Sequence, residues 1–158
     1  MTELSHIDES GKARMVDVGA KPATERRARA SGFIRMASGT LEAIERNQLA
    51  KGDVIAVARV AGVMAAKRTA ELIPLCHSLP LDDVQIRIEL DGSLPGLRVE
   101  AEASTTGRTG VEMEAIVGVM VTLVTVYDMA KAHDRGMIIS EIRLDEKAGG
   151  KSGTWTRG

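Results

Sequence analysis

Charged side chains that could do chemistry stand at the two ends of one apolar segment. Residues 106–134 read TGRTGVEMEAIVGVMVTLVTVYDMAKAHD, with Glu112 and Glu114 near the start and Asp128 and Lys131 near the end. Clustered carboxylates and ammonium groups can transfer protons when their proximity shifts their pKa values toward neutrality. The ends of this segment are therefore candidate acid–base sites.

Each of these residues also has a purely structural explanation. Thr109 and Glu112 match a capping box, in which the two side chains satisfy backbone N–H groups at a helix start. Glu114 lies about 200° further around the helix, where a carboxylate interacts favourably with the helix dipole. Asp128 and Lys131 are spaced like an exposed ion pair. The residue pattern leaves both explanations open.

A second candidate region is the loop IPLCHSLPL. It holds Cys76 and His77 between Pro74 and Pro80, and stiff irregular backbone of this kind suits a binding loop. A structural histidine and a small buried cysteine are the alternatives.

Lys51 just precedes an expected helix, where it indicates either an anion site at the helix N-terminus or a solvated side chain.

Composition limits the class of protein. The chain has 158 residues, of which 44% are hydrophobic, 27% are charged and 2% are aromatic, and its net charge is −1. These values are typical of one globular domain, with no whole-chain bias toward nucleic acid or membrane, and they disfavour base-stacking platforms. One cysteine allows no intramolecular disulfide, and the start lacks a secretory signal pattern, so we expect a cytoplasmic protein.

Known metal and nucleotide motifs are not matched. Three histidines and one cysteine, widely separated, form no structural zinc pattern, so no protein-bound metal is expected. The stretch GGKS lacks the first glycine of a phosphate-binding P-loop, because Asp145 stands at that position, and no strand-to-helix context surrounds it.

Hydrophobic periodicity predicts the order of elements. In the helix expected at 51–74, Asp53 is the cap, Val57, Ala61, Met64 and Ala65 recur at helical spacing, and Pro74 ends the run. We expect strands at 14–18, 24–36, 84–90, 97–103 and 137–144, and helices at 38–47, 51–74 and within 106–134.

This order predicts an α+β fold, ferredoxin-like, in which helices pack on one face of an antiparallel sheet. We expect a single domain over 1–158, with a flexible arm at about 1–13 and a Gly-rich basic tail at about 147–158. The uncharged span from Ala115 to Tyr127 is too short for a bilayer, which needs about 20 apolar residues. We therefore expect protein to cover this helix on nearly all sides, with the sheet on one face and a partner chain on another.

The order and spacing of several stretches resemble the MoaC family, the cyclic pyranopterin monophosphate synthases of molybdenum cofactor biosynthesis. The resemblance covers nearly the whole chain and is carried by LSHIDESGKARMVDV, KGDVIAVARVAGVMAAKRTAELIPLCHSLPL, TGRTGVEMEA, YDMAKAHDRGM and GGKSG. It implies a ferredoxin-like subunit in a homohexamer, built as a trimer of dimers. It also implies a lyase that converts a cyclised dihydro-GTP, made by a radical SAM partner enzyme, to cyclic pyranopterin monophosphate and pyrophosphate.

The resemblance also assigns site residues. Asp128 would be the catalytic acid/base, and Lys51 and Lys131 the other essential residues. Substrate-binding residues would be Leu75, Cys76, His77, Met113 and Glu114, and supporting ones Asp17, Arg26, Lys67, Arg108 and Glu112. Because the step involves no redox change, no cofactor is implied, while Mg²⁺ accompanying the substrate triphosphate stays open.

Two other functions remain as alternatives: a non-catalytic oligomeric module that binds a purine nucleotide, and a structural assembly unit without a nucleotide ligand. The geometry of one helix adds a further expectation. Glu114 and Asp128 are fourteen residues apart, or about 21 Å along a helix, so one reacting ring cannot contact both. We therefore expect an active site shared between two subunits across a two-fold axis.

Overall fold

The computed structural model describes residues 10–158, and within them five strands and four helices follow one another. They are β1 (Thr24–Arg35), α1 (Ser38–Glu45), α2 (Val54–Lys67), α3 (Thr69–Leu72), β2 (Asp83–Asp91), β3 (Gly96–Gly107), α4 (Glu112–Ala130), β4 (Ile138–Ala148) and β5 (Trp155–Thr156).

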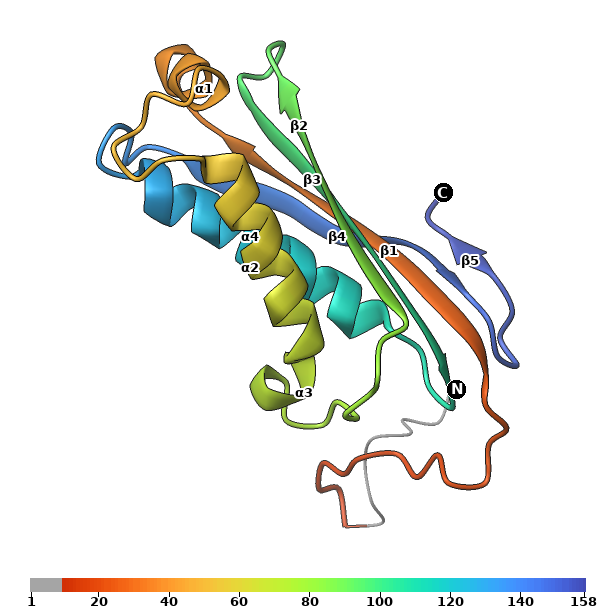
Figure 1. Cartoon of the computed structure of the whole chain (residues 1–158). Helices are drawn as coiled ribbons and strands as arrows, with labels where there is room; N and C mark the ends of the chain where they lie inside the picture. Colours follow the sequence, from red (N-terminus) through yellow and green to blue (C-terminus); the bar gives the residue numbers. More distant parts are fainter. Residues whose placement is uncertain (1–9) are drawn as a thin grey trace.

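The strands form one antiparallel sheet in the order β2-β3-β1-β4-β5. Its first four strands have the ferredoxin-like arrangement, and β5 extends the β4 edge. Figure 1 shows α2 and α4 on the same side of the sheet, with α1 and α3 near opposite ends. The predicted fold class is confirmed.

Successive side chains of β1 point to opposite faces of the sheet. Ala28, Ala30 and Ile34 are buried beneath the helices, whereas Arg27 and Arg29 lie on the opposite face. Both arginines form ion pairs with Glu146 of β4. The small residues of β1 let α4 pack close to the sheet, and about half of the residues of this helix are buried.

The contact between α2 and α4 depends on a glycine. A Cβ placed at Gly62 would collide with the Thr122 hydroxyl and come within 3.0 Å of the Gly118 carbonyl oxygen. Figure 1 shows that the two helices run antiparallel, so the start of α2 lies near the end of α4. This arrangement brings Lys51 to the end of α4.

The outward face of the two helices is apolar. Val57, Val60 and Met64 on α2 are about half exposed, as are Met120 and Val124 on α4. The sequence placed Val57 and Met64 on one apolar stripe of this helix with Ala61 and Ala65; of these four, the structure buries only Ala65, in a stripe with Val54, Ala58, Gly62 and Ala66.

Several local predictions were wrong. Residues 14–18 form no strand, and the helix predicted at 51–74 divides into α2 and α3. The capping box is absent, because α4 begins at Glu112 after Val111, with no side-chain cap. The Asp53 cap is confirmed, since its carboxylate accepts from Ala56 N at 2.9 Å. The predicted basic tail contains β5, and residues 1–9 of the predicted arm lie outside the described part.

By length and composition alone, α4 could cross a membrane. Its position in the fold gives another reason for its apolar character, because it is the central helix of the core, packed against β1, β3, β4 and α2.

Candidate active site

Lys51, Asp128 and Lys131 meet at the C-terminal end of α4. The Asp128 carboxylate accepts from Lys51 Nζ at 2.8 Å through Oδ2 and from Lys131 Nζ at 2.7 Å through Oδ1. Lys51 Nζ also donates to the Asp128 carbonyl oxygen at 3.0 Å. The predicted i,i+3 ion pair is present, and a second lysine, distant in sequence, completes a three-residue cluster.

Local structure explains how Lys51 arrives there. Gly52 adopts φ +88°, a conformation that favours glycine, and Asp53 then caps α2. Lys51 thus leaves the start of α2 pointing at the neighbouring C-terminus of α4, where a cation is favoured by the helix dipole.

The two ammonium groups control the titration of Asp128. Hydrogen bonds from Lys131 and then Lys51 lower the pKa of Asp128 to about 2. The carboxylate is therefore ionised near neutral pH and holds two cations at the surface. A carboxylate with so low a pKa is a weak base.

A second hollow, of about 290 Å³, lies at the other end of α4, between the helix start and the loop after α3. The carboxylate of Glu114 is one of its polar groups, and Cys76 Sγ lies 3.9 Å from Glu114 Oε1. The hollow is lined by Ile73, Leu75, Cys76, His77, Leu79, Thr109, Gly110, Glu112, Met113 and Glu114. The five predicted substrate-binding residues therefore lie together.

Glu114 is in an unusual environment. The residue is only 3% exposed, and its Oε2 has no hydrogen-bond partner among residues 10–158. Burial, followed by repulsion from Glu112, raises the pKa of Glu114. Burial and the proximity of Glu114 likewise raise the pKa of the Cys76 thiol. A buried carboxylate with a free acceptor oxygen suits a ligand that brings N–H donors.

His77 holds the edge of this hollow. Its Nε2 lies 2.7 Å from the Val16 carbonyl oxygen, so Nε2 carries the donated proton. This bond attaches the segment before β1 to the loop after α3.

A larger cavity of about 600 Å³ adjoins the Glu114 hollow; we call it the basic cavity. Five of its side chains are cations, against the single carboxylate of Glu112. It is lined by Lys21, Pro22, Thr24, Arg26, Arg108, Thr109, Gly110, Glu112, Lys147, Gly150, Lys151 and Ser152.

Glu112 connects the two hollows, because it lines both, as do Thr109 and Gly110. Its carboxylate forms an ion pair with Lys147 Nζ at 3.5 Å and does not cap the helix. These three residues form a wall shared by the two hollows. One elongated ligand could therefore lie across it, with an anionic part in the basic cavity and a hydrogen-bonding ring beside Glu114.

Not every residue named from the resemblance lies in these sites. Arg26, Arg108 and Glu112 line the basic cavity, but Lys67 and Asp17 line neither hollow. Asp17 accepts from its neighbour Gly19 N at 2.8 Å, and Lys67 is exposed at the end of α2.

Sequence reasoning missed the lysines of the basic cavity, namely Lys21, Lys147 and Lys151. Lys147 and Lys151 lie in the predicted Gly-rich basic tail, and GGKSG is one of the stretches that carry the family resemblance, but neither signal assigned these lysines to a site.

The Lys51–Asp128–Lys131 cluster and the Glu114 hollow lie at opposite ends of α4. Fourteen residues separate Glu114 from Asp128, or about 21 Å along the helix axis. Within the described chain, the predicted site residues therefore lie in two separate groups.

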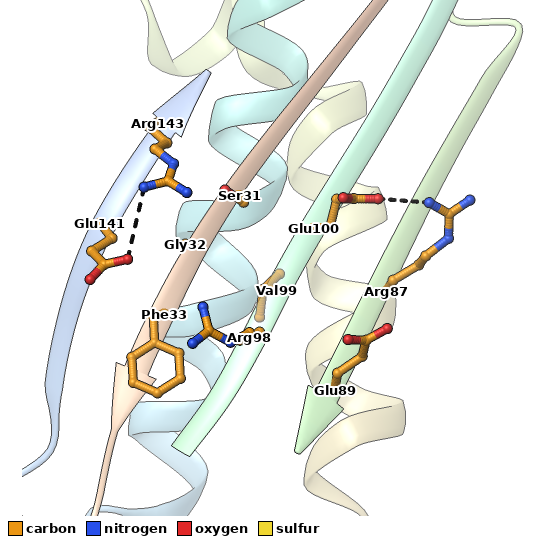
Figure 2. A pocket seen from close by; sticks show the side chains of 10 residues that line it. All are labelled: Ser31, Gly32, Phe33, Arg87, Glu89, Arg98, Val99, Glu100, Glu141 and Arg143. Atoms are coloured by element: carbon orange, nitrogen blue, oxygen red, sulfur yellow. Dashed lines mark hydrogen bonds and ion pairs between the residues drawn. The ribbon is translucent and has the colours of Figure 1, made fainter. Parts of the chain in front are cut away.

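A third hollow, of about 160 Å³, opens on the far face of the sheet and contains none of the predicted site residues. Figure 2 shows Arg87 turned to Glu100 and Arg143 turned to Glu141. The nitrogen–oxygen distances of these ion pairs are 2.7 Å and 3.9 Å, respectively. The guanidinium of Arg98 lies 5.1 Å from the centre of the Phe33 ring and also pairs with Asp91. These arginines are already neutralised, unlike the excess cations of the basic cavity.

Residues 10–158 contain no group of three or more His, Cys, Asp or Glu side chains arranged to hold a metal ion. The cations of the basic cavity are the groups available for an anionic ligand.

The described residues thus form a ferredoxin-like domain with a basic cavity beside a buried carboxylate. Comparison with known proteins gives the family: residues 15–150 match the MoaC family, and the chain belongs to it. A relative from Thermomicrobium roseum is 57% identical over 99% of this chain and 95% of its own length. One from Brucella ovis is 60% identical over 97% and 93%. Each is named cyclic pyranopterin monophosphate synthase.

Proposed function

We propose that the chain is a lyase that converts 3′,8-cyclo-7,8-dihydro-GTP to cyclic pyranopterin monophosphate with release of pyrophosphate. The observation that carries the proposal is the junction of the basic cavity with the Glu114 hollow. A nucleotide triphosphate, with a charge near −4, needs several cations at one end and ring recognition at the other. The names of the relatives support the same reaction.

Glu114 is suited to recognise the ring. A guanine-derived ring presents neighbouring N–H donors, and a carboxylate can accept from two of them at once. Such a ligand would satisfy Glu114 Oε2, which has no partner within residues 10–158. Ring binding would thereby remove the energetic cost of burying this carboxylate.

The reaction requires proton transfers and charge stabilisation. In the cyclic phosphate step a ribose hydroxyl attacks the α-phosphorus; one P–O bond forms, the bond to the β-phosphate oxygen breaks, and a base takes the hydroxyl proton. Pyrophosphate leaves more easily once cations neutralise it. The Lys51 and Lys131 ammonium groups, both held by Asp128, supply the acidic protons for opening the five-membered nitrogen ring.

A second copy of the chain would complete the site. The apolar face made by Val57, Val60 and Met64 of α2 and Met120 and Val124 of α4 lies about midway along both helices. Large exposed apolar side chains grouped in this way are typical of a subunit interface. A two-fold axis through this face would place the Glu114 end of one α4 beside the Asp128 end of the other.

The proposed assembly and its surroundings follow the family resemblance. We propose a homohexamer built from such dimers, a cytoplasmic location, a radical SAM enzyme as the supplier of substrate, and no resident cofactor; Mg²⁺ would come only with the triphosphate.

Reconstitution tests the reaction. The chain, the radical SAM enzyme, GTP and SAM are combined, and the products are oxidised and examined for a fluorescent pterin. Pterin formation that requires this chain is the expected result. Nucleotide binding without pterin would instead indicate a non-catalytic binding module, and absence of both would indicate an assembly unit.

Subunit mixing tests the shared site. Inactive Glu114→Ala and Asp128→Ala proteins are mixed under conditions that allow subunit exchange, and turnover is measured. Activity should return, because a mixed dimer carries one intact site and one doubly damaged site. Proven exchange without recovered turnover would contradict the shared site, as would a fully active monomer.

A further inference from the structure

The turn between α4 and β4 is attached to the start of α1 by one carboxylate. Asp134 Oδ2 accepts from the backbone nitrogen of Ala37 at 2.9 Å and from the Thr40 hydroxyl at 3.3 Å. Asp134 Oδ1 accepts from Gly136 N, within the turn itself, at 2.8 Å. Asp134 and Ala37 are ninety-seven residues apart in the chain, and Figure 1 shows α1 at the same end of the sheet as the last turn of α4.

The start of α1 depends on this contact. Ala37 occupies the N-cap position and its side chain makes no capping hydrogen bond, so the free N–H groups of the helix start need an acceptor from elsewhere. Asp134 supplies that acceptor, and a negative charge is favoured at a helix N-terminus. The hydrogen bond from Ala37 N, followed by the bonds from Gly136 N and Thr40, lowers the pKa of Asp134. The carboxylate is therefore charged near neutral pH.

The same turn carries one residue of the Lys51–Asp128–Lys131 cluster. Lys131 ends α4, and its backbone nitrogen donates to the Tyr127 carbonyl oxygen at 2.9 Å. Asp134 N donates to the Ala130 carbonyl oxygen at 3.0 Å, which folds the turn back on the helix. The Tyr127 hydroxyl adds a second attachment, because it donates to the carbonyl oxygen of residue 135 at 3.1 Å.

The position of the helix end controls the geometry of the cluster. The last carbonyl groups of a helix have no intrahelical partner, and the Asp128 carbonyl oxygen, one of these, accepts from Lys51 Nζ at 3.0 Å. Lys131 Nζ donates to the carboxylate of Asp128 at 2.7 Å. Both lysine side chains are flexible and half-exposed. The backbone at the end of α4 therefore determines whether the two ammonium groups meet at Asp128.

We propose that Asp134 is a positioning residue for the reaction: by fixing the turn after α4 against α1, it keeps Lys51 and Lys131 together at Asp128. The inference rests on the proposed function in taking this cluster to transfer protons. Asp134 acts through the turn, because its two oxygens already accept from three groups of the protein. Loss of Asp134 should impair the chemical step and spare substrate binding by the Glu114 hollow and the basic cavity.

Steady-state kinetics of Asp134→Ala, with the cyclised dihydro-GTP as substrate, tests the inference. The kcat should fall about 10–10²-fold, because a misplacement of about 1 Å can cost that much, while KM stays within about two-fold of wild type. Asp134→Asn keeps one acceptor oxygen, enough for Ala37 N and Thr40, so its kcat should fall less. Wild-type kcat in Asp134→Ala, or a raised KM with kcat unchanged, would overturn the inference.

The titration of Asp128 is a readout that a general loss of stability would not move. Hydrogen bonds from Lys131 and then Lys51 lower the pKa of Asp128 to about 2. In folded Asp134→Ala the lysines separate, so this pKa should rise toward its ordinary value of 3.8. NMR of the carboxyl carbon from roughly pH 3 to pH 6 distinguishes the two values. An unchanged pKa of Asp128 in the folded variant would overturn the inference.

A milder variant keeps the inference testable if Asp134→Ala does not fold. Tyr127→Phe keeps the ring and removes only the hydroxyl that donates to the carbonyl oxygen of residue 135. Its kcat should fall about 3–10-fold with KM unchanged. Wild-type kcat in Tyr127→Phe would contradict the dependence of the cluster on this turn.

Asp91→Ala is the matched control. Asp91 also accepts three hydrogen bonds within a turn, from Ser93 N, Ser93 Oγ and Arg98 Nε, but this turn joins β2 and β3. Asp91→Ala should therefore keep kcat within about two-fold of wild type. A loss of kcat as large as that of Asp134→Ala would show that breaking any such turn is sufficient, and would overturn the specific role.

The two proposals fail separately. If wild-type protein yields no pterin while Asp134→Ala raises the pKa of Asp128, the proposed reaction is wrong and Asp134 still positions the cluster. If pterin forms but Asp134→Ala changes neither kcat nor the pKa of Asp128, only the positioning role is wrong.

Discussion

Replacing Glu114 by glutamine should stabilise the protein while impairing its function. The side chain is 3% exposed, and Oε2 has no partner within residues 10–158. An unsatisfied buried polar group costs about 1–3 kcal/mol, and more when it is charged. Glutamine keeps the size and removes the charge, so Glu114→Gln should gain about 2 kcal/mol at pH 8. For a domain of this size, that raises Tm by roughly 4–8 °C.

The stability gained by Glu114→Gln should depend on pH. Burial raises the pKa of Glu114 from its ordinary value of 4.5, so the folded state binds this proton more tightly than the unfolded state. The stability that this tighter proton binding contributes is complete below the pKa of Glu114 in the unfolded state. It is lost as pH rises through the raised pKa of Glu114 in the folded state. Glutamine has no such titration. The Tm difference between Glu114→Gln and wild type should therefore be small at pH 5 and grow toward pH 8.

The assay is thermal unfolding followed by circular dichroism across this pH range, with Glu42→Gln as the control. Glu42 is exposed on α1, so its replacement should change stability by less than about 0.5 kcal/mol at each pH. Turnover of Glu114→Gln should fall about 10–100-fold, because a hydrogen bond to a charged acceptor is worth about 1.5–3 kcal/mol. A Tm at pH 8 equal to or below that of wild type would refute the reasoning and show that Glu114 has a stabilising partner in the assembled protein.

The remaining predictions concern three other parts of the fold. Lys51→Ala and Lys131→Ala should each lower turnover at least about 10²-fold. Folding should stay intact, because both lysine side chains are half-exposed at helix ends. Turnover near the wild-type rate would show that the lysine concerned has no role in the reaction. His77→Ala should weaken substrate binding or turnover. It should also lower the free energy of unfolding by about 1 kcal/mol, because the hydrogen bond to the backbone of residue 16 is lost. If the free energy of unfolding falls by several kcal/mol and binding is unchanged, the role of His77 is purely structural. Gly62→Ala should destabilise by about 1–3 kcal/mol in chemical denaturation, because its methyl group meets the Thr122 hydroxyl between α2 and α4; a neutral effect would contradict this packing.

Much of the fold follows from local patterns. Strict alternation from Val84 to Leu90, followed by DGSLPG and a second alternating run, predicts the β2–β3 hairpin because side chains on a strand alternate between faces. Asp53 marks the start of α2 because its side chain needs only the N–H three residues ahead. These interactions lie within a few residues, so periodicity and capping rules suffice to find them.

Other local patterns misled because a distant contact prevailed. The sequence TGVE satisfies the capping-box rule, yet Glu112 pairs with Lys147 of β4, thirty-five residues away. Val57 and Met64 have helical spacing, but the close approach of Gly62 to Thr122 rotates the other stripe of α2 inward. Spacing identifies an amphipathic helix without fixing which side meets its neighbour.

The residue types of the site, the α+β order of elements and the family resemblance that assigned Lys51, Asp128 and Lys131 can all be read from the amino-acid order alone. Only the tertiary structure placed the Lys51 ammonium 2.8 Å from a carboxylate seventy-seven residues away. It also buried Glu114 without a partner and set the Gly149–Gly150 turn on Arg26 to form the basic cavity. Burial, cavities and ion pairs depend on which elements pack together, and packing is a property of the whole chain that no short stretch encodes.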